Sequence, residues 1–117
     1  MVGGVQSSAG SWIPATEKIG GGPSVLYDAV AILPGKDAEE SLAKSPAARD
    51  FANDAFAHLK FIAYTSPALT LFEKCGLAAN LDGGCVSLSK ELDVSKFVKL
   101  CTALRFWDRA ESLGAQA

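Results

Sequence analysis

The sequence is poor in the residues that build metal sites and catalytic dyads. It has one histidine, His58, and three cysteines without any CxxC spacing. A zinc site usually takes four ligands that include a close pair, so this inventory argues against a bound metal. Cys75, Cys85 and Cys101 are therefore interpreted as small buried hydrophobic residues, and they are also the candidate redox thiols of the chain.

Long hydrophobic runs and an excess of one charge are missing too. Polar residues interrupt every apolar run well before the roughly 18 residues that suggest a membrane span. The formal net charge is −2, and Lys and Arg are scattered among Asp and Glu. The sequence therefore has no basic stripe that could bind the phosphate backbone of a nucleic acid. Met1 is followed by Val-Gly-Gly, which does not resemble a secretory leader. We expect one globular domain without a nucleic-acid or membrane partner.

What the sequence does contain is an alternation of strand and helix signals, which indicates an α/β fold with a parallel sheet. The run Ser24–Leu33 is almost continuously apolar and ends in Pro-Gly, as in a strand that is covered on both faces. A helix opened by Ser45-Pro46 and a second buried strand, FIAYT, complete a βαβ unit over residues 24–65. A further helix, a short strand after the DGG turn and a C-terminal helix are expected to follow.

These signals divide the chain into three parts. Residues 1–23 are Gly- and Ser-rich and predict an arm or hairpin, residues 24–112 predict the α/β domain, and residues 113–117 predict a frayed tail. A doubly wound domain usually opens with a strand and helix from the middle of its sheet, and here an arm stands in their place. We therefore expect the domain to be truncated on its N-terminal side.

Helix caps are predicted at Ser45, Ser66 and Asp93. The last of these opens a final helix with an apolar stripe at three- and four-residue spacing, which we expect to be buried. The basic residues of this helix are expected to lie largely outside. The stripe consists of Val94, Phe97, Val98, Cys101, Leu104 and Trp107, and the basic residues are Lys96, Lys99, Arg105 and Arg109.

Ser66 has a second interpretation as a catalytic nucleophile, because it ends an apolar strand and is followed at once by a helix, the layout of a nucleophile elbow. A serine hydroxyl needs an adjacent base, and the sole histidine, His58, lies upstream near the far end of the same strand. The Ser-Pro-Ala sequence also repeats at Ser45, where another helix starts. We favour the N-cap and keep Ser66 as a candidate nucleophile.

Two other polar clusters are interpreted as structural. The glycines of IGGG precede a strand, whereas a phosphate-binding loop follows a strand and opens a helix. Asp37, Glu39 and Glu40 stand together in a polar connection, and we expect them to form a solvated face.

Three blocks of the sequence carry a resemblance to a known family. PSVLYDAVAILPG, FANDAFAHLKFIAYTSPA and FVKLCTALRFWDR resemble, in their order and spacing, the C-terminal domain of large-subunit catalases, with fungal enzymes as the expected source. That domain is similar to the class I glutamine amidotransferase-like group of flavodoxin-like folds. The resemblance implies a three-layer architecture, a parallel sheet with helices on both faces.

The resemblance also implies where the catalase chemistry lies. In that family the haem is held by the N-terminal core, so this chain is expected to hold no cofactor and to be non-catalytic. His58, Tyr27 and Tyr64 are expected to be structural and not haem ligands. In enzymes of the amidotransferase-like group, a cysteine nucleophile occupies the elbow that Ser66 occupies here.

The leading hypothesis from the resemblance is an accessory domain that stabilises a tetrameric catalase, with the catalase core and sister subunits as partners. Self-association and protection of unfolded client proteins are expected as well, because a truncated parallel sheet leaves unpaired edges and apolar faces such as AVAIL and FIAY. The alternative is a small hydrolase or glyoxalase-like enzyme that uses Ser66 or a cysteine. A flavin module rests on fold analogy alone. The sequence does not decide the localisation: fungal enzymes of this type are often secreted, and bacterial ones are cytoplasmic.

Overall fold

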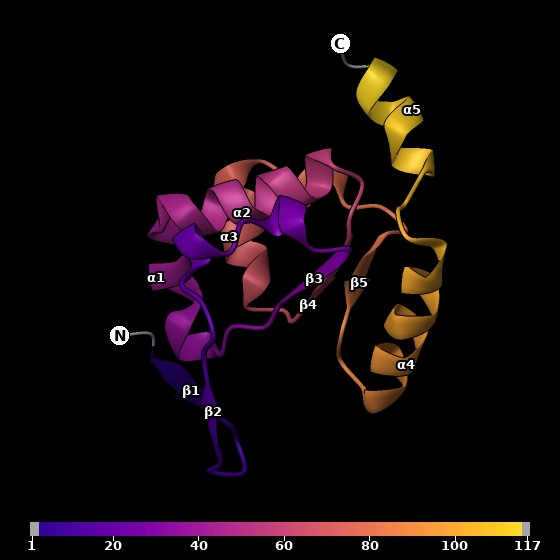
Figure 1. The fold of residues 1–117 in the computed structure, drawn as a ribbon. Coiled ribbons are helices and arrows are strands. Elements are labelled where there is room, and N and C mark those ends of the chain that lie inside the picture. The colour runs from indigo at the N-terminus through magenta and orange to yellow at the C-terminus, as the bar shows by residue number, and fades with distance from the viewer. Residues whose placement is uncertain (1–2, 116–117) are drawn as a thin grey trace.

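The computed structural model describes residues 3–115 as a small parallel sheet with helices on both sides (Figure 1). The strands are β1 (Gly4–Gln6), β2 (Trp12–Pro14), β3 (Ala29–Ile32), β4 (Phe61–Tyr64) and β5 (Cys85–Ser87). The helices are α1 (Glu39–Lys44), α2 (Pro46–Ala57), α3 (Ala68–Cys75), α4 (Glu91–Leu100) and α5 (Asp108–Ala115). This arrangement confirms the predicted α/β class and is consistent with a flavodoxin-like fold.

The main sheet has the order β3-β4-β5, and both of its strand pairs are parallel. β4 is the central strand, and its residues Phe61, Ile62 and Ala63 are buried. β1 and β2 form a separate antiparallel hairpin, which projects away from the main sheet in Figure 1. No helix among residues 3–115 is long and apolar enough to cross a bilayer.

The hydrophobic core lies between one face of the sheet and helices α1, α2 and α3. Small residues let α2 approach the sheet closely, since Ala48, Ala52 and Ala55 are all buried. Phe72 of α3 is fully buried and meets Tyr64 edge to face, with ring centroids 5.2 Å apart. The FIAY segment is therefore interior, which contradicts the expectation that this strand offers an exposed apolar face.

The first strand of the main sheet is shorter than predicted. Residues Ser24–Leu26 form a 3-10 turn, and extended pairing begins only at Ala29. Tyr27, expected to lie in a buried strand, is 45% exposed. An apolar run alone does not distinguish a strand from the turn that leads into it.

Of the three predicted caps, only Ser45 caps its helix as expected. It is the N-cap of α2, and its Oγ accepts from the N–H of Ala48 at 3.2 Å. Asp93 lies inside α4, at its third position, where its carboxylate accepts from the N–H groups of Ser89 and Lys90. Those hydrogen bonds lower the pKa of Asp93.

The predicted C-terminal helix is broken into two, which contradicts the expected continuous stripe. α4 ends at Leu100, a 3-10 turn follows, and Leu104 adopts a positive φ of 70°. The chain then reverses, and the N–H of Phe106 donates to the carbonyl of Leu59 at 2.7 Å. Phe106 also meets Phe61 on the sheet face opposite the core, with ring centroids 6.0 Å apart. This tertiary contact overrides the helical periodicity of the sequence.

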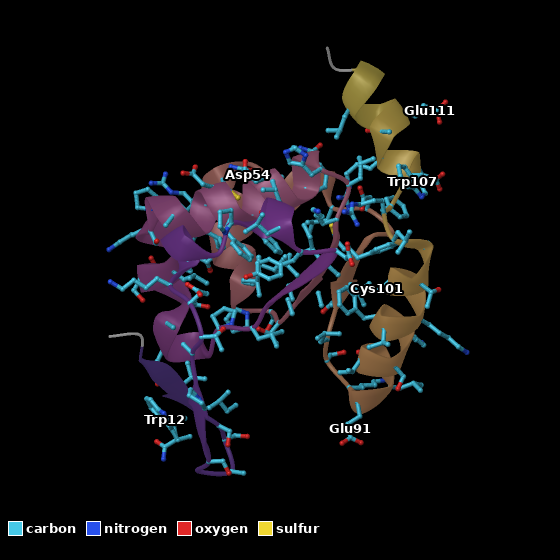
Figure 2. The ribbon with its side chains drawn as sticks, viewed as in Figure 1. Trp12, Asp54, Glu91, Cys101, Trp107 and Glu111 are labelled. Atoms are coloured by element: carbon cyan, nitrogen blue, oxygen red, sulfur yellow. The ribbon has the colours of Figure 1, made fainter. Side chains whose placement is uncertain are left out.

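Every residue of α4 is at least partly exposed, and so is the apolar stripe. Val98, Leu104 and Trp107 are each about 60% exposed, and Figure 2 shows Trp107 near the start of α5. The helix α5 continues to Ala115, so residues 113–115 are helical and not frayed, whereas residues 1–2 and 116–117 of the predicted arm and tail lie outside the described residues.

Candidate functional site: the Arg109 clasp

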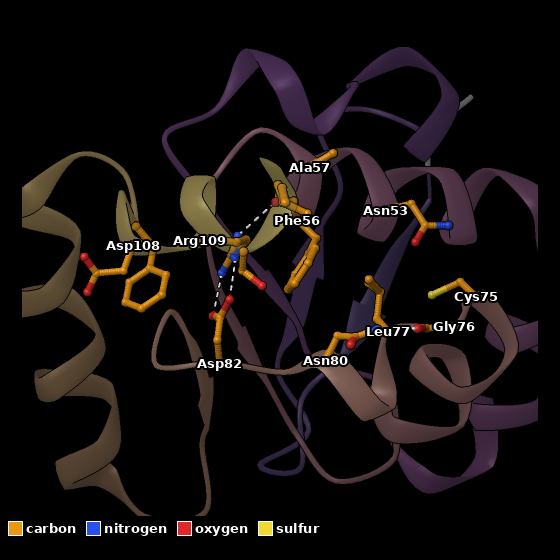
Figure 3. Close-up of a pocket in the computed structure, with 13 residues that line it drawn as sticks. Asn53, Phe56, Ala57, Cys75, Gly76, Leu77, Asn80, Asp82, Asp108 and Arg109 are labelled. Carbon is orange, nitrogen blue, oxygen red and sulfur yellow. Dashed lines mark hydrogen bonds and ion pairs between the residues drawn. The ribbon is translucent and has the colours of Figure 1, made fainter. Parts of the chain in front are cut away.

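Arg109, at the second position of α5, is the largest fully buried side chain of the protein. Its Nε donates to Oδ2 of Asp82 at 2.7 Å, and its Nη2 donates to Oδ1 at 2.8 Å, a bidentate ion pair. Its Nη1 donates to the carbonyls of Phe56 at 3.1 Å and Lys60 at 2.9 Å (Figure 3). The prediction that Arg109 lies outside is wrong.

Two aromatic rings flank the guanidinium. Its central carbon lies 4.2 Å from the centroid of the Phe56 ring and 5.4 Å from that of Phe106. The flat cation is attracted to the negative faces of such rings, more strongly when water is excluded. We call this group of Arg109, Asp82, Phe56, Phe106 and Gly84 the Arg109 clasp.

Gly84 belongs to the clasp because nothing larger fits there. A Cβ at this position would lie 2.7 Å from Nη2 of Arg109 and 2.8 Å from Cβ of Phe106. The N–H of Gly84 donates to Oδ1 of Asp82 at 3.0 Å. The DGG turn thus supplies a carboxylate, a backbone donor and the space for the arginine.

The electrostatics of the clasp stabilise the ionised carboxylate. Burial raises the pKa of Asp82, but the hydrogen bonds and charge of Arg109, together with the N–H of Gly84, outweigh it and hold the pKa below its usual value. Burial also raises the pKa of the neighbouring Cys85 thiol to about 11, and the charge of Asp82 adds to this rise. Cys85 is consequently a thiol and not a thiolate at neutral pH.

The hydrogen-bonding capacity of the clasp is used internally. Arg109 has five N–H donors, and its second Nη2 hydrogen points to the Sγ of Cys85, 3.7 Å away. Both oxygens of Asp82 accept from Arg109. A hollow of about 600 Å³ lies beside the clasp, between α2, the end of α3 and α5 (Figure 3), and two of the charged residues that line it, Arg109 and Asp82, are paired with each other. The arrangement is suited to fastening three segments together.

Ser66 lies between β4 and α3, as the elbow interpretation requires, but its surroundings do not support either predicted role. The N-cap of α3 is Pro67, and within residues 3–115 no side chain caps this helix. Ser66 uses its backbone carbonyl, which accepts from the N–H of Leu69 at 3.0 Å. The cap prediction for Ser66 is therefore wrong.

The histidine is remote from Ser66. His58 is the exposed C-cap of α2, before β4, and Ser66 follows the same strand. The four residues of β4 separate them by about 13 Å of extended chain, too far for a direct hydrogen bond between base and nucleophile.

The cysteines are free thiols, and each is partly buried. Burial raises the pKa of Cys75 and Cys101 as it does that of Cys85, which lowers the thiolate fraction of all three. Among residues 3–115, no three His, Cys, Asp or Glu side chains gather closely enough to share a metal ion.

Three residues are expected from the sequence to be structural and not haem ligands, namely Tyr64, Tyr27 and His58. Burial raises the pKa of the half-buried Tyr64 phenol, which disfavours its ionised form. Tyr27 and His58 are exposed on the surface.

The acidic cluster lies at the start of α1. Asp37 is in a 3-10 turn, and Glu39 and Glu40 occupy the first turn of α1, where carboxylates interact favourably with the helix dipole.

The sequence analysis missed the clasp for an identifiable reason. Arg109 and Asp82 are 27 residues apart, and neither belongs to a motif with fixed spacing. An arginine beside Phe-Trp-Asp at the end of an apolar stripe is usually assigned to the solvated face.

Comparison with known proteins places the chain. Residues 21–111 match the family described as the C-terminal domain found in long catalases. Catalase C of Rhizobium meliloti is 43% identical over 112 residues, which cover 96% of this chain and 16% of that protein. Catalase HPII of Pseudomonas putida is 29% identical over 105 residues, which cover 90% of this chain and 14% of that protein.

The match extends over the α/β domain and includes the clasp, while the chain spans only about one sixth of the length of these relatives. The chain belongs to the family of C-terminal domains found in long catalases.

Proposed function

We propose that this chain is a non-catalytic accessory domain that stabilises the assembly of a haem catalase. The observation that carries the proposal is the saturation of the Arg109 clasp: the Arg109 guanidinium and the Asp82 carboxylate are engaged with each other and with backbone groups of the same domain. The haem and the decomposition of hydrogen peroxide would belong to the catalase core. The core and sister subunits would be the partners of this domain.

The test uses the long catalase that contains this sequence. Phe72→Ala disrupts the core of the domain, and Ala79→Ser, at an exposed residue away from α4, serves as the control. We expect Phe72→Ala to lower the temperature at which subunits dissociate, with the initial rate and the haem spectrum unchanged at low temperature. A loss of rate or haem at low temperature would contradict a purely accessory role.

A second experiment addresses catalysis by the chain alone. The 117-residue chain is incubated with hydrogen peroxide, with and without added haem, and oxygen release is followed. We expect no release above that of buffer or of haem alone, since the proposal assigns the haem to the catalase core. Turnover that required the folded chain would overturn the proposal.

A protective role toward unfolded proteins is supported by one further observation. Several large apolar side chains in and after α4 are largely exposed, namely Leu92, Val98, Leu104 and Trp107. Contiguous exposed apolar surface often marks a site of interaction with other proteins. We expect the chain to suppress aggregation of a heat-denatured client at near-stoichiometric ratio and Val98→Ser with Leu104→Ser to weaken this. Unchanged aggregation with the original chain would contradict the protective role.

A further inference from the structure

Two hollows join into one groove between α2, α3 and α5. The first is the hollow of about 600 Å³ beside the clasp, and the second, of about 360 Å³, lies between α2 and α3. Asn53 of α2 and Cys75 of α3 line both hollows, so the two meet at these residues. Figure 3 shows Asn53 and Cys75 together at the end of the larger hollow that is farther from Arg109. The combined space, called the α2–α3 groove below, has the size of a small-molecule site.

The smaller hollow carries an excess of positive charge. Arg49 of α2 and Lys74 of α3 line it together with a single carboxylate, that of Asp50. Within residues 3–115 neither cation forms an ion pair, and the Nε of Arg49 is buried without a hydrogen-bond acceptor. The flat fork of an arginine whose charge is unpaired is suited to a carboxylate or a phosphate. This end of the groove therefore favours an anion.

The charges along the groove give it a direction. Burial raises the pKa of Cys75, and the nearby charge of Arg49 opposes this rise, which places the cation close to the junction of the two hollows. At the opposite end, Figure 3 shows Asp108 beyond the clasp, and the ion pair of the clasp has no net charge. An anionic group is consequently attracted to the Arg49 end and repelled from the Asp108 end.

The larger hollow offers mainly apolar walls, which include the side chains of Phe56 and Leu77. Flat rings pack favourably against such walls, and the amide of Asn53 at the junction can both donate and accept. We propose that the α2–α3 groove binds a small aromatic anion, with its carboxylate or phosphate between Arg49 and Lys74 and its ring in the larger hollow. This site uses none of the charges of the clasp, so it is independent of the accessory role proposed above.

The first test separates the contribution of the charge from that of the ring. Isothermal titration calorimetry of the 117-residue chain compares naphthoate and naphthyl phosphate with neutral naphthylmethanol and with acetate, which has no ring. We expect both aromatic anions to bind at least about tenfold more tightly than the other two compounds. The tighter of the two anions identifies the preferred headgroup. Equal binding of naphthoate and naphthylmethanol, or no binding of either aromatic anion, would overturn the proposal.

The second test locates the anion on the chain. Arg49→Gln should raise the dissociation constant of naphthoate about tenfold, because it removes the charged fork. Lys74→Gln should raise it about two- to fivefold, and because Lys74 is exposed this variant keeps the test decisive if Arg49→Gln fails to fold. Lys99→Gln, at an exposed lysine of α4, is the matched control and should leave the constant unchanged.

Two results of the second test would contradict the assigned site. An equal loss of affinity in Lys99→Gln and Lys74→Gln would mean that naphthoate responds only to the overall charge of the chain. Affinity that is indifferent to both Arg49→Gln and Lys74→Gln would place naphthoate elsewhere, for example on the exposed apolar side chains of α4. Either result would overturn the proposal.

Discussion

The two halves of this domain are held together by different means. In the first half, β3, β4 and helices α1 to α3 enclose a hydrophobic core in which alanines pack with Leu71 and Phe72. In the second half, α4 leaves its apolar residues exposed, and α5 is fastened by the Arg109 clasp. The comparison teaches that an apolar stripe in the sequence does not ensure burial, and that a single buried arginine can anchor a segment that has little apolar packing.

The strongest test of this comparison removes a large side chain from each half. Phe72→Ala should lower the free energy of unfolding by about 3–5 kcal/mol, because a fully buried ring leaves a cavity. Val98→Ala, on the exposed face of α4, should change it by less than about 0.5 kcal/mol. Urea denaturation measures both. Equal losses would mean that the two halves are packed alike.

Removing the Arg109 side chain should lower the free energy of unfolding somewhat less than Phe72→Ala does, and mainly through the second half. Arg109→Met leaves the Asp82 carboxylate without its cation and the Phe56 and Lys60 carbonyls without a donor, so we expect a loss of about 2–4 kcal/mol. Hydrogen exchange should accelerate in α5 before it does in α3. Arg109→Lys, the matched control, keeps the charge but not the bidentate fork and should recover part of the loss. Full stability of Arg109→Met would contradict the anchoring role.

The space around the arginine can be tested without changing any charge. Gly84→Ala should destabilise the domain by about 1–3 kcal/mol, because the added methyl group would overlap Arg109 and Phe106. Gly83→Ala is the matched control, since its methyl group would meet only the edge of the Phe106 ring, at 3.3 Å. Thermal unfolding distinguishes the two. The same unfolding temperature for both variants would show that the clasp accommodates a methyl group at position 84.

Acid should loosen the clasp in a defined direction. The pKa of Asp82 is lower in the folded state than its ordinary value of 3.8, so its ionisation stabilises the fold above that value. This contribution is lost as the pH falls through the lowered folded pKa. We expect stability to decline below about pH 4 and Asp82→Asn to show a shallower decline. Parallel curves for the two proteins would assign acid sensitivity to other carboxylates, such as Asp93.

The sequence by itself determined the local and periodic features. Alternating signals identified the parallel α/β class, and Ser45 before Pro46 predicted the start of α2, because both depend on neighbours within a few residues. The apparently equivalent Ser66 differs, because its helix begins one residue later and takes no side-chain cap. Identical tripeptides therefore have different roles once the incoming strand fixes the backbone.

The tertiary structure alone decided where the C-terminal residues go. Periodicity predicted one helix with a buried stripe and Arg109 outside, yet the chain turns at Leu104 and buries Arg109 while Val98 and Trp107 remain exposed. The physical reason is that the arginine finds five acceptors and two aromatic rings only when residues distant in sequence converge. Contacts between residues distant in sequence leave no periodic pattern in the sequence. An amphipathic helix does leave such a pattern, even where the sheet is too small to cover its apolar stripe.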